Sequence, residues 1–204
     1  MTEKKYCYQY PHPAVTADCV IFGYDGVQLR VLLIERGAEP YKGCWALPGG
    51  FMNIDESAEQ CARRELEEET GLTDIEVVQF YTASAVERDP RERVITVAHY
   101  ALVPMSEAVA GDDARNVGWF GLDEMPTLAF DHAEILPLAI EHLRHRASTT
   151  PLLLSLMPEE FTVAQLAKAA EAVLGTKVGR PTVRRKLLSS NQVRPEGRTH
   201  FRKL

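Results

Sequence analysis

The sequence lacks the features that mark membrane-spanning and disulfide-linked chains. No apolar run approaches the roughly 18 to 20 residues of a membrane helix, and residues 1–6 lack the apolar stretch of a signal peptide. The few cysteines form no C-x-x-C pair and have no histidine at ligand spacing; they are Cys7, Cys19, Cys44 and Cys61. Neither a zinc site nor a disulfide framework is therefore expected. We expect a cytoplasmic chain with reduced thiols and no membrane partner.

Charge is distributed unevenly along the chain. The 204 residues include 23 Lys+Arg and 29 Asp+Glu, which gives a formal net charge of −6. Residues 175–204 nevertheless contain nine basic residues and one acid, so this segment has a charge of +8 and the rest has −14. The two parts have opposite electrostatic character, and the basic part suits a polyanion such as double-stranded DNA.

Hydrophobic periodicity and turn residues predict an α/β region. Two β-branched runs are separated by Asp25-Gly26, a pair typical of β-hairpin turns. Ser57 and Gln60 have the spacing of a helix capping box, and Gly71 is a suitable C-cap. We expect strands at residues 17–22, 29–34, 77–83 and 94–102, and helices at residues 55–70 and 132–146.

A second, smaller region is predicted after residues 147–151, which have the composition of a linker. The domains would then be residues 1–147 and 151–204. Thr162 and Gly175 suit the two ends of a helix, and a Gly-containing turn leads to a second helix with Pro181 in its first turn. Val183, Leu187 and Leu188 would form its buried stripe. Residues 195–197 suit a tight turn between basic strands, as in a winged helix-turn-helix.

Not all of the acidic residues on the first predicted helix lie on its solvent-exposed face. With about 100° per residue, Glu65, Glu68 and Glu69 continue the apolar stripe, whereas Glu56, Glu59 and Glu67 fall on the opposite half. Three neighbouring carboxylates repel one another, and a single guanidinium, Arg64, cannot neutralise them. An oxygen-preferring divalent ion, Mg²⁺ or Mn²⁺, would do so and would suit a phosphate-containing substrate.

The same stretch resembles a Nudix box with every fixed position filled: Gly50, five residues, Glu56, seven residues, then residues 64–72. The resemblance implies a Nudix α/β/α sandwich around a mixed sheet and metal-dependent hydrolysis of a nucleoside diphosphate linked to another moiety. It also implies that Glu65, Glu68 and Glu69 bind metal together with the Gly49 carbonyl, that Arg64 orients the acids and that Glu56 supports the loop. The general base stays open among Glu87, Glu107, Asp112 and Asp113.

Three further segments, residues 45–51, 88–94 and 128–132, resemble the ADP-ribose pyrophosphatase-like Nudix branch. That branch includes the Nudix-related transcriptional regulators of NAD metabolism. Arg36, Arg88 and Arg91 are candidates for phosphate binding, and Phe51 or Phe130 for stacking on adenine. The alternative is a surface ion pair for each arginine and a position in the core for each phenylalanine. We expect Trp45 and Trp119 in the core and His132 at a helix start.

The leading prediction is the first of two functions, an enzyme, and the second is the alternative. The first is a metal-dependent pyrophosphohydrolase that cleaves ADP-ribose or a related nucleoside diphosphate-linked molecule. The second is an ADP-ribose-sensing, DNA-binding regulator of NAD or sugar metabolism. The candidate DNA contacts are Arg184, Arg185, Lys186 and Arg198. The alternative to DNA binding is that the basic module only supports dimerisation or forms a lid. A homodimer is expected.

Overall fold

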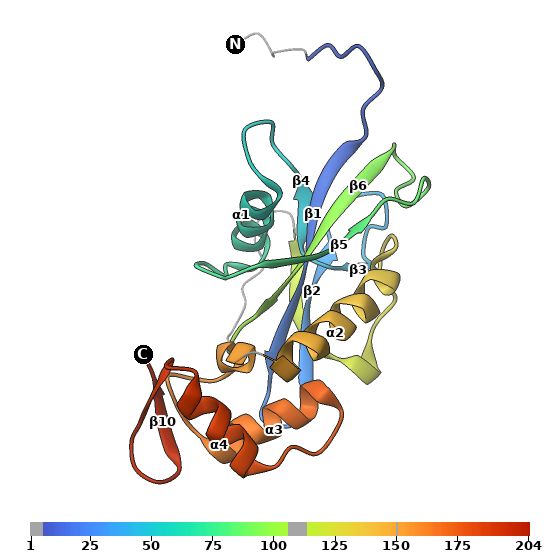
Figure 1. Ribbon diagram of the computed structural model, residues 1–204. Helices are drawn as coiled ribbons and strands as arrows, with labels where there is room; N and C mark the ends of the chain where they lie inside the picture. Colours follow the sequence, from blue (N-terminus) through green and yellow to red (C-terminus); the bar gives the residue numbers. More distant parts are fainter. Residues whose placement is uncertain (1–5, 106–113, 150) are drawn as a thin grey trace.

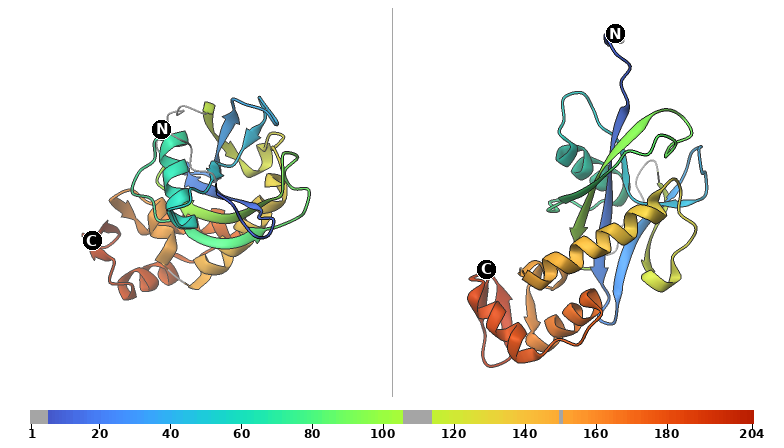
Figure 2. Two further views of the ribbon diagram at one scale, coloured as in Figure 1. Left: turned by 90° about the horizontal axis from the view of Figure 1, so that it is seen from above. Right: turned by 45° about the vertical axis from the view of Figure 1, so that its right-hand side comes forward.

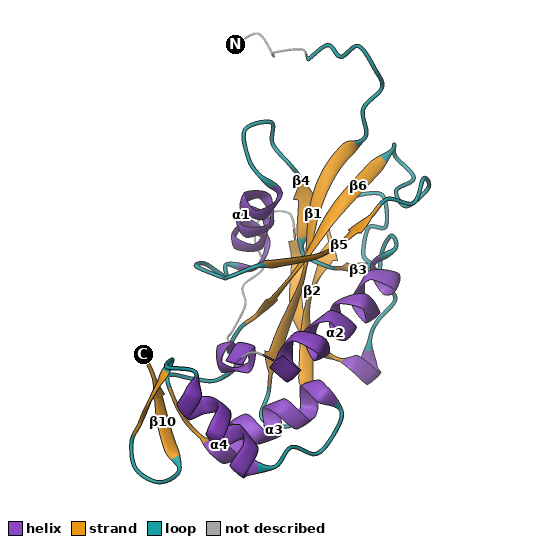
Figure 3. Ribbon diagram, in the orientation of Figure 1, coloured by secondary structure: helices purple, strands orange, loops and turns teal. Residues whose placement is uncertain are grey.

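The computed structural model describes residues 6–105, 114–149 and 151–204, and its elements are shown in Figures 1 and 3. In the first part of the chain they are β1 (Ala14–Tyr24), β2 (Leu29–Arg36), β3 (Trp45–Ala46), β4 (Gly49–Phe51), α1 (Ala58–Thr70), β5 (Val78–Ala83), β6 (Val94–Leu102), β7 (Ala114–Gly121), η1 (Leu122–Glu124) and α2 (His132–Thr149). They continue with η2 (Pro151–Leu156), β8 (Glu160–Thr162), α3 (Val163–Leu174), α4 (Arg180–Ser189), β9 (Val193–Pro195) and β10 (His200–Lys203). None of the helices in the described ranges combines the length and apolar character that a membrane span requires.

The first ten elements contain a seven-stranded mixed sheet. Its strand order is β3-β2-β1-β6-β5, with β4 paired to β1 and β7 paired to β2. β1 runs parallel to β6 and antiparallel to β2 and β4. In the β1–β2 turn the Asp25 carboxylate accepts hydrogen bonds from the backbone N–H groups of Val27 and Gln28, both at 2.8 Å. The predicted hairpin and mixed sheet are therefore confirmed.

Helices cover both faces of this sheet (Figures 1 and 2). β1 is buried on both sides, so its apolar residues run without polar alternation after Asp18. Ala17, Cys19 and Ile21 belong to the same core cluster as Cys61 and Leu66 of α1. The alternating side chains of β1, Val20 and Phe22, belong to the cluster that contains Leu143 of α2. This arrangement confirms the predicted α/β/α sandwich.

The first helix begins and ends at the residues that its capping signals indicate. The Gln60 N–H donates to the Ser57 hydroxyl oxygen at 3.2 Å, and the Ser57 N–H donates to the Gln60 side-chain oxygen at 2.8 Å. Gly71 closes α1 in the left-handed conformation with φ of 70°. The predicted start at residue 55 was too early, because the capping box makes Ala58 the first helical residue.

The predicted linker is mostly helical. α2 continues to Thr149, and the 3-10 helix η2 begins at Pro151, while residue 150 lies outside the described residues. Ala147 is 5% exposed and belongs to the main core cluster, as does Leu143 one turn earlier. The apolar stripe of α2 therefore extends past Arg146, and its burial outweighs the turn preference of the Ser and Thr residues that follow.

The C-terminal region is the predicted winged helix. Thr162 caps α3 through a reciprocal capping box with Gln165, and Gly175 ends the helix. The strands form a small sheet of order β8-β10-β9, in which β9 and β10 make the wing. The sequence did not predict β8. Leu188 was also wrong as a buried residue: it is 44% exposed, because it lies about 100° around α4 from the buried Leu187.

The two regions share a core. A single hydrophobic cluster contains Phe22 of β1, Leu143 of α2, Leu166 of α3 and Phe201 of β10. Figure 1 shows α3 lying beneath α2, at the end of the sheet remote from the N-terminus. The winged helix is thus packed onto the sandwich.

Candidate functional site

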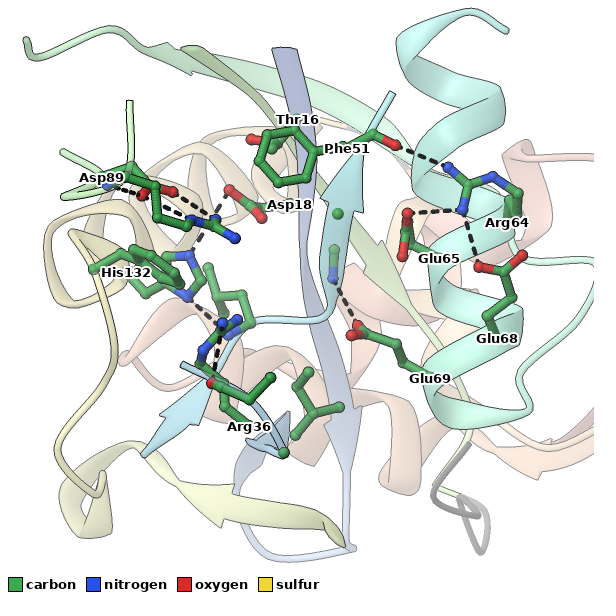
Figure 4. Close-up of a pocket in the computed structure, with 18 of the residues that line it drawn as sticks. Thr16, Asp18, Arg36, Phe51, Arg64, Glu65, Glu68, Glu69, Asp89 and His132 are labelled. Carbon is green, nitrogen blue, oxygen red and sulfur yellow. Dashed lines mark hydrogen bonds and ion pairs between the residues drawn. The ribbon is translucent and has the colours of Figure 1, made fainter. Parts of the chain in front are cut away.

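A pocket of about 680 Å³ lies around β4, between α1 and the loops that precede β6 and α2 (Figure 4). It brings together the residues predicted for metal and substrate binding and the arginine predicted to orient the acids: Arg36, Gly49, Phe51, Arg64, Glu65, Glu68, Glu69, Arg88, Arg91 and Phe130. Figure 4 shows Glu65, Glu68 and Glu69 approaching from α1 on one side, and Asp18, Asp89 and His132 on the other. Residues as far apart in the sequence as Thr16 and His132 therefore line one cavity.

Arg64 organises the carboxylates on the α1 side. One of its terminal nitrogens, Nη1, lies 2.7 Å from Glu65 and 2.9 Å from Glu68, and the other, Nη2, lies 2.7 Å from Glu56. Hydrogen bonds from Arg64 lower the pKa of Glu56 to about 2, and the same bonds raise the pKa of Arg64. A single guanidinium thus serves three carboxylates, and the group keeps an excess of negative charge.

Two glycines allow the acids to approach the β4 backbone. The Gly49 N–H donates to the Glu69 carboxylate at 2.8 Å, and Glu69 is only 8% exposed. A Cβ on Gly50 would meet the Glu65 carboxylate, so any larger residue would force this carboxylate away from β4. Burial raises the pKa of Glu65, and it outweighs the opposing effect of Arg64. A partly desolvated carboxylate of this kind is stabilised by a nearby cation.

These residues fit a hard divalent ion in type, because they offer several carboxylate oxygens within one cavity. In the described ranges, however, no three His, Cys, Asp or Glu side chains are already arranged to hold a metal ion. Arg64 bonds one oxygen of Glu65 and one of Glu68, so each carboxylate keeps a second oxygen. Convergence of Glu65, Glu68 and Glu69 on one ion remains a prediction.

Arginine and aromatic side chains form the opposite part of the pocket. The Arg36 guanidinium carbon lies 4.8 Å from the centre of the Phe130 ring. That of Arg91 lies 5.0 Å from the Phe51 ring and 5.7 Å from the Phe130 ring. An ion pair of 2.7 Å holds Arg91 to Asp89. Planar cations over aromatic faces create a surface that suits both a nucleobase and a phosphate.

Arg88 has a different environment from the other two arginines. Its side chain is 3% exposed and donates to Asp131 at 2.7 and 2.9 Å and to Asp18 at 3.5 Å. These bonds raise its pKa despite burial, which acts in the opposite direction. Arg88 therefore holds two acidic segments together at the pocket wall, and its predicted phosphate contact would compete with both.

The sequence analysis did not identify Thr16, Asp18 and Asp89 as pocket residues, and it placed His132 only at a helix start. His132 does begin α2, but it is also 3% exposed and lines the pocket. Thr16 and Asp18 alternate with apolar residues on β1. This alternation of polar residues at the start of a buried strand was the available signal, since such positions share one face of the sheet.

Of the four candidate general bases, the structure describes Glu87 alone. Glu87 is exposed and does not line the cavity. Glu107, Asp112 and Asp113 lie outside the described residues. The general base therefore remains open among these four residues.

The basic residues of the winged helix are divided between surfaces. Arg184 and Arg198 line one groove of about 490 Å³, together with Arg180 at the start of α4. Arg185 is exposed beside it, whereas Lys186 lines a small apolar cavity between α4 and α3. On the wing, Arg202 forms ion pairs with Glu160 and Glu196. The structure thus groups two of the four predicted DNA contacts in one groove.

Comparison with known protein families agrees with both regions. A family model of the NUDIX domain matches residues 12–139, and a model of the NrtR DNA-binding winged helix domain matches residues 153–203. The ADPR responsive transcriptional repressor NtrR of Acinetobacter baylyi is 35% identical over 189 residues, which cover 90% of this chain and 76% of the repressor. The ADP-ribose pyrophosphatase of Methanocaldococcus jannaschii is 42% identical over 127 residues, which cover 62% of this chain and 73% of that enzyme.

Solved structures show the same two-part similarity. Shewanella oneidensis NrtR has a TM-score of 0.80 and 30% identity, with 93% of each chain covered. The same protein in complex with a 27mer DNA gives a TM-score of 0.79. Its NUDIX domain in complex with ADP ribose gives 0.62 at 34% identity, covering 66% of this chain and 90% of that domain.

Proposed function

Because this chain belongs to the Nudix family and ends in a winged helix domain of the NrtR type, we propose that it is a DNA-binding regulator that responds to ADP-ribose or a related nucleoside diphosphate. The observation that supports this most directly is the pairing of one polar, arginine-lined pocket with a basic groove on the same packed unit. The similarity to the NtrR repressor over 90% of the chain supports the same conclusion.

In this proposal the arginine and aromatic side of the pocket binds the nucleotide. Phe51 and Phe130 supply ring faces for adenine, and Arg36 and Arg91 supply charge for the diphosphate. Arg36 is anchored by a 2.8 Å hydrogen bond to the Pro40 carbonyl, and Arg91 is anchored by Asp89. Both guanidinium groups are therefore held in place before the ligand arrives, which lowers the entropy lost on binding.

In this proposal the basic groove would bind DNA through contacts with its phosphates. Arg184, Arg185 and Arg198 would contact the backbone, with Lys186 at the edge of the same helix. A homodimer would place two such grooves on paired half-sites. The test is the charge reversal of Arg184 and Arg198 together, measured by duplex DNA binding over a range of salt concentrations.

We expect this double variant to bind at least tenfold more weakly and to show a shallower salt dependence by about one unit per lost phosphate contact. Arg63→Glu is the matched control, because Arg63 is an exposed arginine on α1. Equal DNA affinity for the double variant and the control would contradict the DNA-binding role.

Metal-dependent hydrolysis of the same ligand is the second candidate, and the complete carboxylate set of the pocket favours it. Glu65, Glu68, Glu69 and the Gly49 carbonyl would hold Mg²⁺ or Mn²⁺. When bound, the ion would draw charge from the diphosphate and activate water. Arg64 would keep Glu65 and Glu68 oriented toward the cavity, while the Gly49 N–H would hold Glu69.

Hydrolysis is tested by release of AMP from ADP-ribose with and without Mg²⁺. Glu68→Gln removes a proposed metal ligand without changing its size, and we expect the rate to fall by at least a hundredfold. Glu67→Gln is the control, because Glu67 lies next to it on α1 but is exposed and outside the pocket. Absence of metal-dependent turnover in the unaltered chain would remove the hydrolase role and leave the regulator role standing.

A further inference from the structure

Three polar groups in the pocket lack the hydrogen bonds that buried polar groups normally make. The first is the Thr16 hydroxyl. Thr16 lines the pocket and is 6% exposed, yet its Oγ1 has no hydrogen-bond partner among the described residues. A hydroxyl buried without a partner is costly, and at this wall a group that enters the pocket can supply the missing hydrogen bond.

The second group is the outward nitrogen of His132. The Leu47 N–H donates to Nδ1 of His132 at 2.9 Å, so Nδ1 acts as an acceptor and the proton of the neutral ring is on Nε2. Burial lowers the pKa of His132, which keeps this neutral form. Within the described chain the nearest acid to Nε2 is Asp18 at 3.8 Å, beyond hydrogen-bond distance. His132 thus offers a fixed N–H donor to the pocket.

The third group is the Asp18 carboxylate, two residues from Thr16 on the same face of β1. Asp18 is 6% exposed, and its one hydrogen bond in the described chain is a long contact of 3.5 Å with Arg88. Arg88 makes two shorter bonds to Asp131. Asp18 therefore keeps most of its capacity to accept hydrogen bonds.

We propose that Thr16, Asp18 and His132 form a subsite for the vicinal hydroxyl groups of a ribose in the bound ligand. This inference rests on the proposed binding of a nucleoside diphosphate. The carboxylate accepts hydrogen bonds from two neighbouring hydroxyls, and the His132 N–H and the Thr16 hydroxyl donate to their oxygens. The set matches a diol in both the number and the direction of its hydrogen bonds.

Electrostatics favours a neutral diol over a phosphate at this position. The arginine bonded to Asp18, Arg88, makes shorter bonds to the Asp131 carboxylate and does not neutralise Asp18 fully. A phosphate placed against Asp18 would face a buried negative charge at close range. The diphosphate is therefore directed to Arg36 and Arg91, and a sugar to this subsite.

ADP-ribose contains two riboses, so the test uses two deoxy ligands. Equilibrium binding is measured with excess chelator for ADP-ribose, for the analogue lacking the 2′-hydroxyl of the adenosine ribose, and for the analogue lacking the 2-hydroxyl of the terminal ribose. We expect one analogue to bind the unaltered chain at least tenfold more weakly, and that analogue identifies the ribose. Equal affinity for all three ligands would overturn the inference while leaving the proposed function intact.

The variants Thr16→Val and Asp18→Asn then test whether this subsite causes the difference in affinity between ADP-ribose and the weaker analogue. In each variant the preference for ADP-ribose over the weaker analogue should fall below threefold. Thr82→Val, on the exposed part of β5, should keep the full preference. Thr16→Val should fold at least as well as the parent, because it removes a buried hydroxyl without a partner.

His132→Asn provides an independent variant, since its side-chain oxygen can still accept from the Leu47 N–H while the Nε2 donor is lost. An unchanged preference in Thr16→Val and His132→Asn would overturn the subsite. Failure of the unaltered chain to bind any of the three ligands would instead overturn the proposed function, and the subsite with it.

Discussion

The Arg144 guanidinium of α2 donates a hydrogen bond to the Val173 backbone carbonyl of α3, with an Nε–O distance of 3.0 Å. Val173 lies in the last turn of α3, where carbonyl groups lack partners within the helix. The other end of α2 begins with His132 in the pocket. One helix therefore contacts the ligand pocket at its start and the winged helix near its end.

This arrangement predicts that Arg144 couples the two sites. Replacing it with methionine keeps the length of the side chain but removes the bond to Val173. We expect the effect of ADP-ribose on DNA affinity to shrink severalfold in Arg144→Met, while affinity for each ligand alone changes less than threefold. DNA titrations with and without ADP-ribose measure both. Full coupling in the variant would show that α2 transmits its effect by other contacts.

The shared core predicts that both regions unfold together. Leu143 is fully buried in the cluster that joins the sandwich to the winged helix. Leu143→Ala should lower the free energy of unfolding by about 2–5 kcal/mol. Leu138 on the same helix is 37% exposed, so Leu138→Ala should cost about 1 kcal/mol or less. Two separate unfolding transitions in the unaltered chain would argue against a common core.

Stacking on Phe130 predicts selectivity for nucleosides. Phe130→Leu keeps an apolar side chain but removes the ring that Arg36 and Arg91 face. ADP-ribose should bind about tenfold or more weakly, because base stacking contributes about 1–3 kcal/mol. Ribose 5-phosphate, which has no base, should bind equally to both proteins. Calorimetric titration gives both values, and equal losses for the two ligands would indicate general disruption of the pocket.

Acid sensitivity should depend on the Glu56–Arg64 pair. Hydrogen bonds from Arg64 lower the pKa of Glu56 from 4.5 to about 2. A lowered pKa stabilises the folded state above pH 4.5, and this contribution is lost as the pH falls from 4.5 toward 2. The stability difference between the parent and Arg64→Ala should therefore shrink across this interval. Denaturant unfolding at several pH values checks it, and a constant difference would contradict the pairing.

Local signals in the sequence predicted much of the architecture. Ser57, Gly71, Thr162 and Gly175 each bound a helix as expected, because capping depends on residues near one another in the chain. The helical continuation through Ala147 was missed, since it depends on packing against distant residues.

The candidate site was only partly predictable for the same reason. The box residues are close in sequence and carry a pattern, whereas Thr16 of β1 and His132 of α2 line one pocket only once α2 is packed on the sheet. The lack of hydrogen-bond partners for the Thr16 hydroxyl and the His132 Nε2 can be recognised only in the tertiary structure. The bonds of Arg64 to Glu65 and Glu68 are local and follow from helical spacing, whereas its bonds to Glu56 and the Phe51 carbonyl depend on how the loop before α1 folds back on the helix.

The central claim is that one chain binds an ADP-ribose-type ligand and adjusts its DNA affinity in response. The most direct measurement is the affinity of the full chain for duplex DNA selected from a random-sequence library, determined with and without saturating ADP-ribose at fixed salt. The account predicts a shift of about fivefold or more, within the usual range of coupling between two binding sites. Identical DNA affinities in the two conditions, with ADP-ribose shown to be bound, would contradict it.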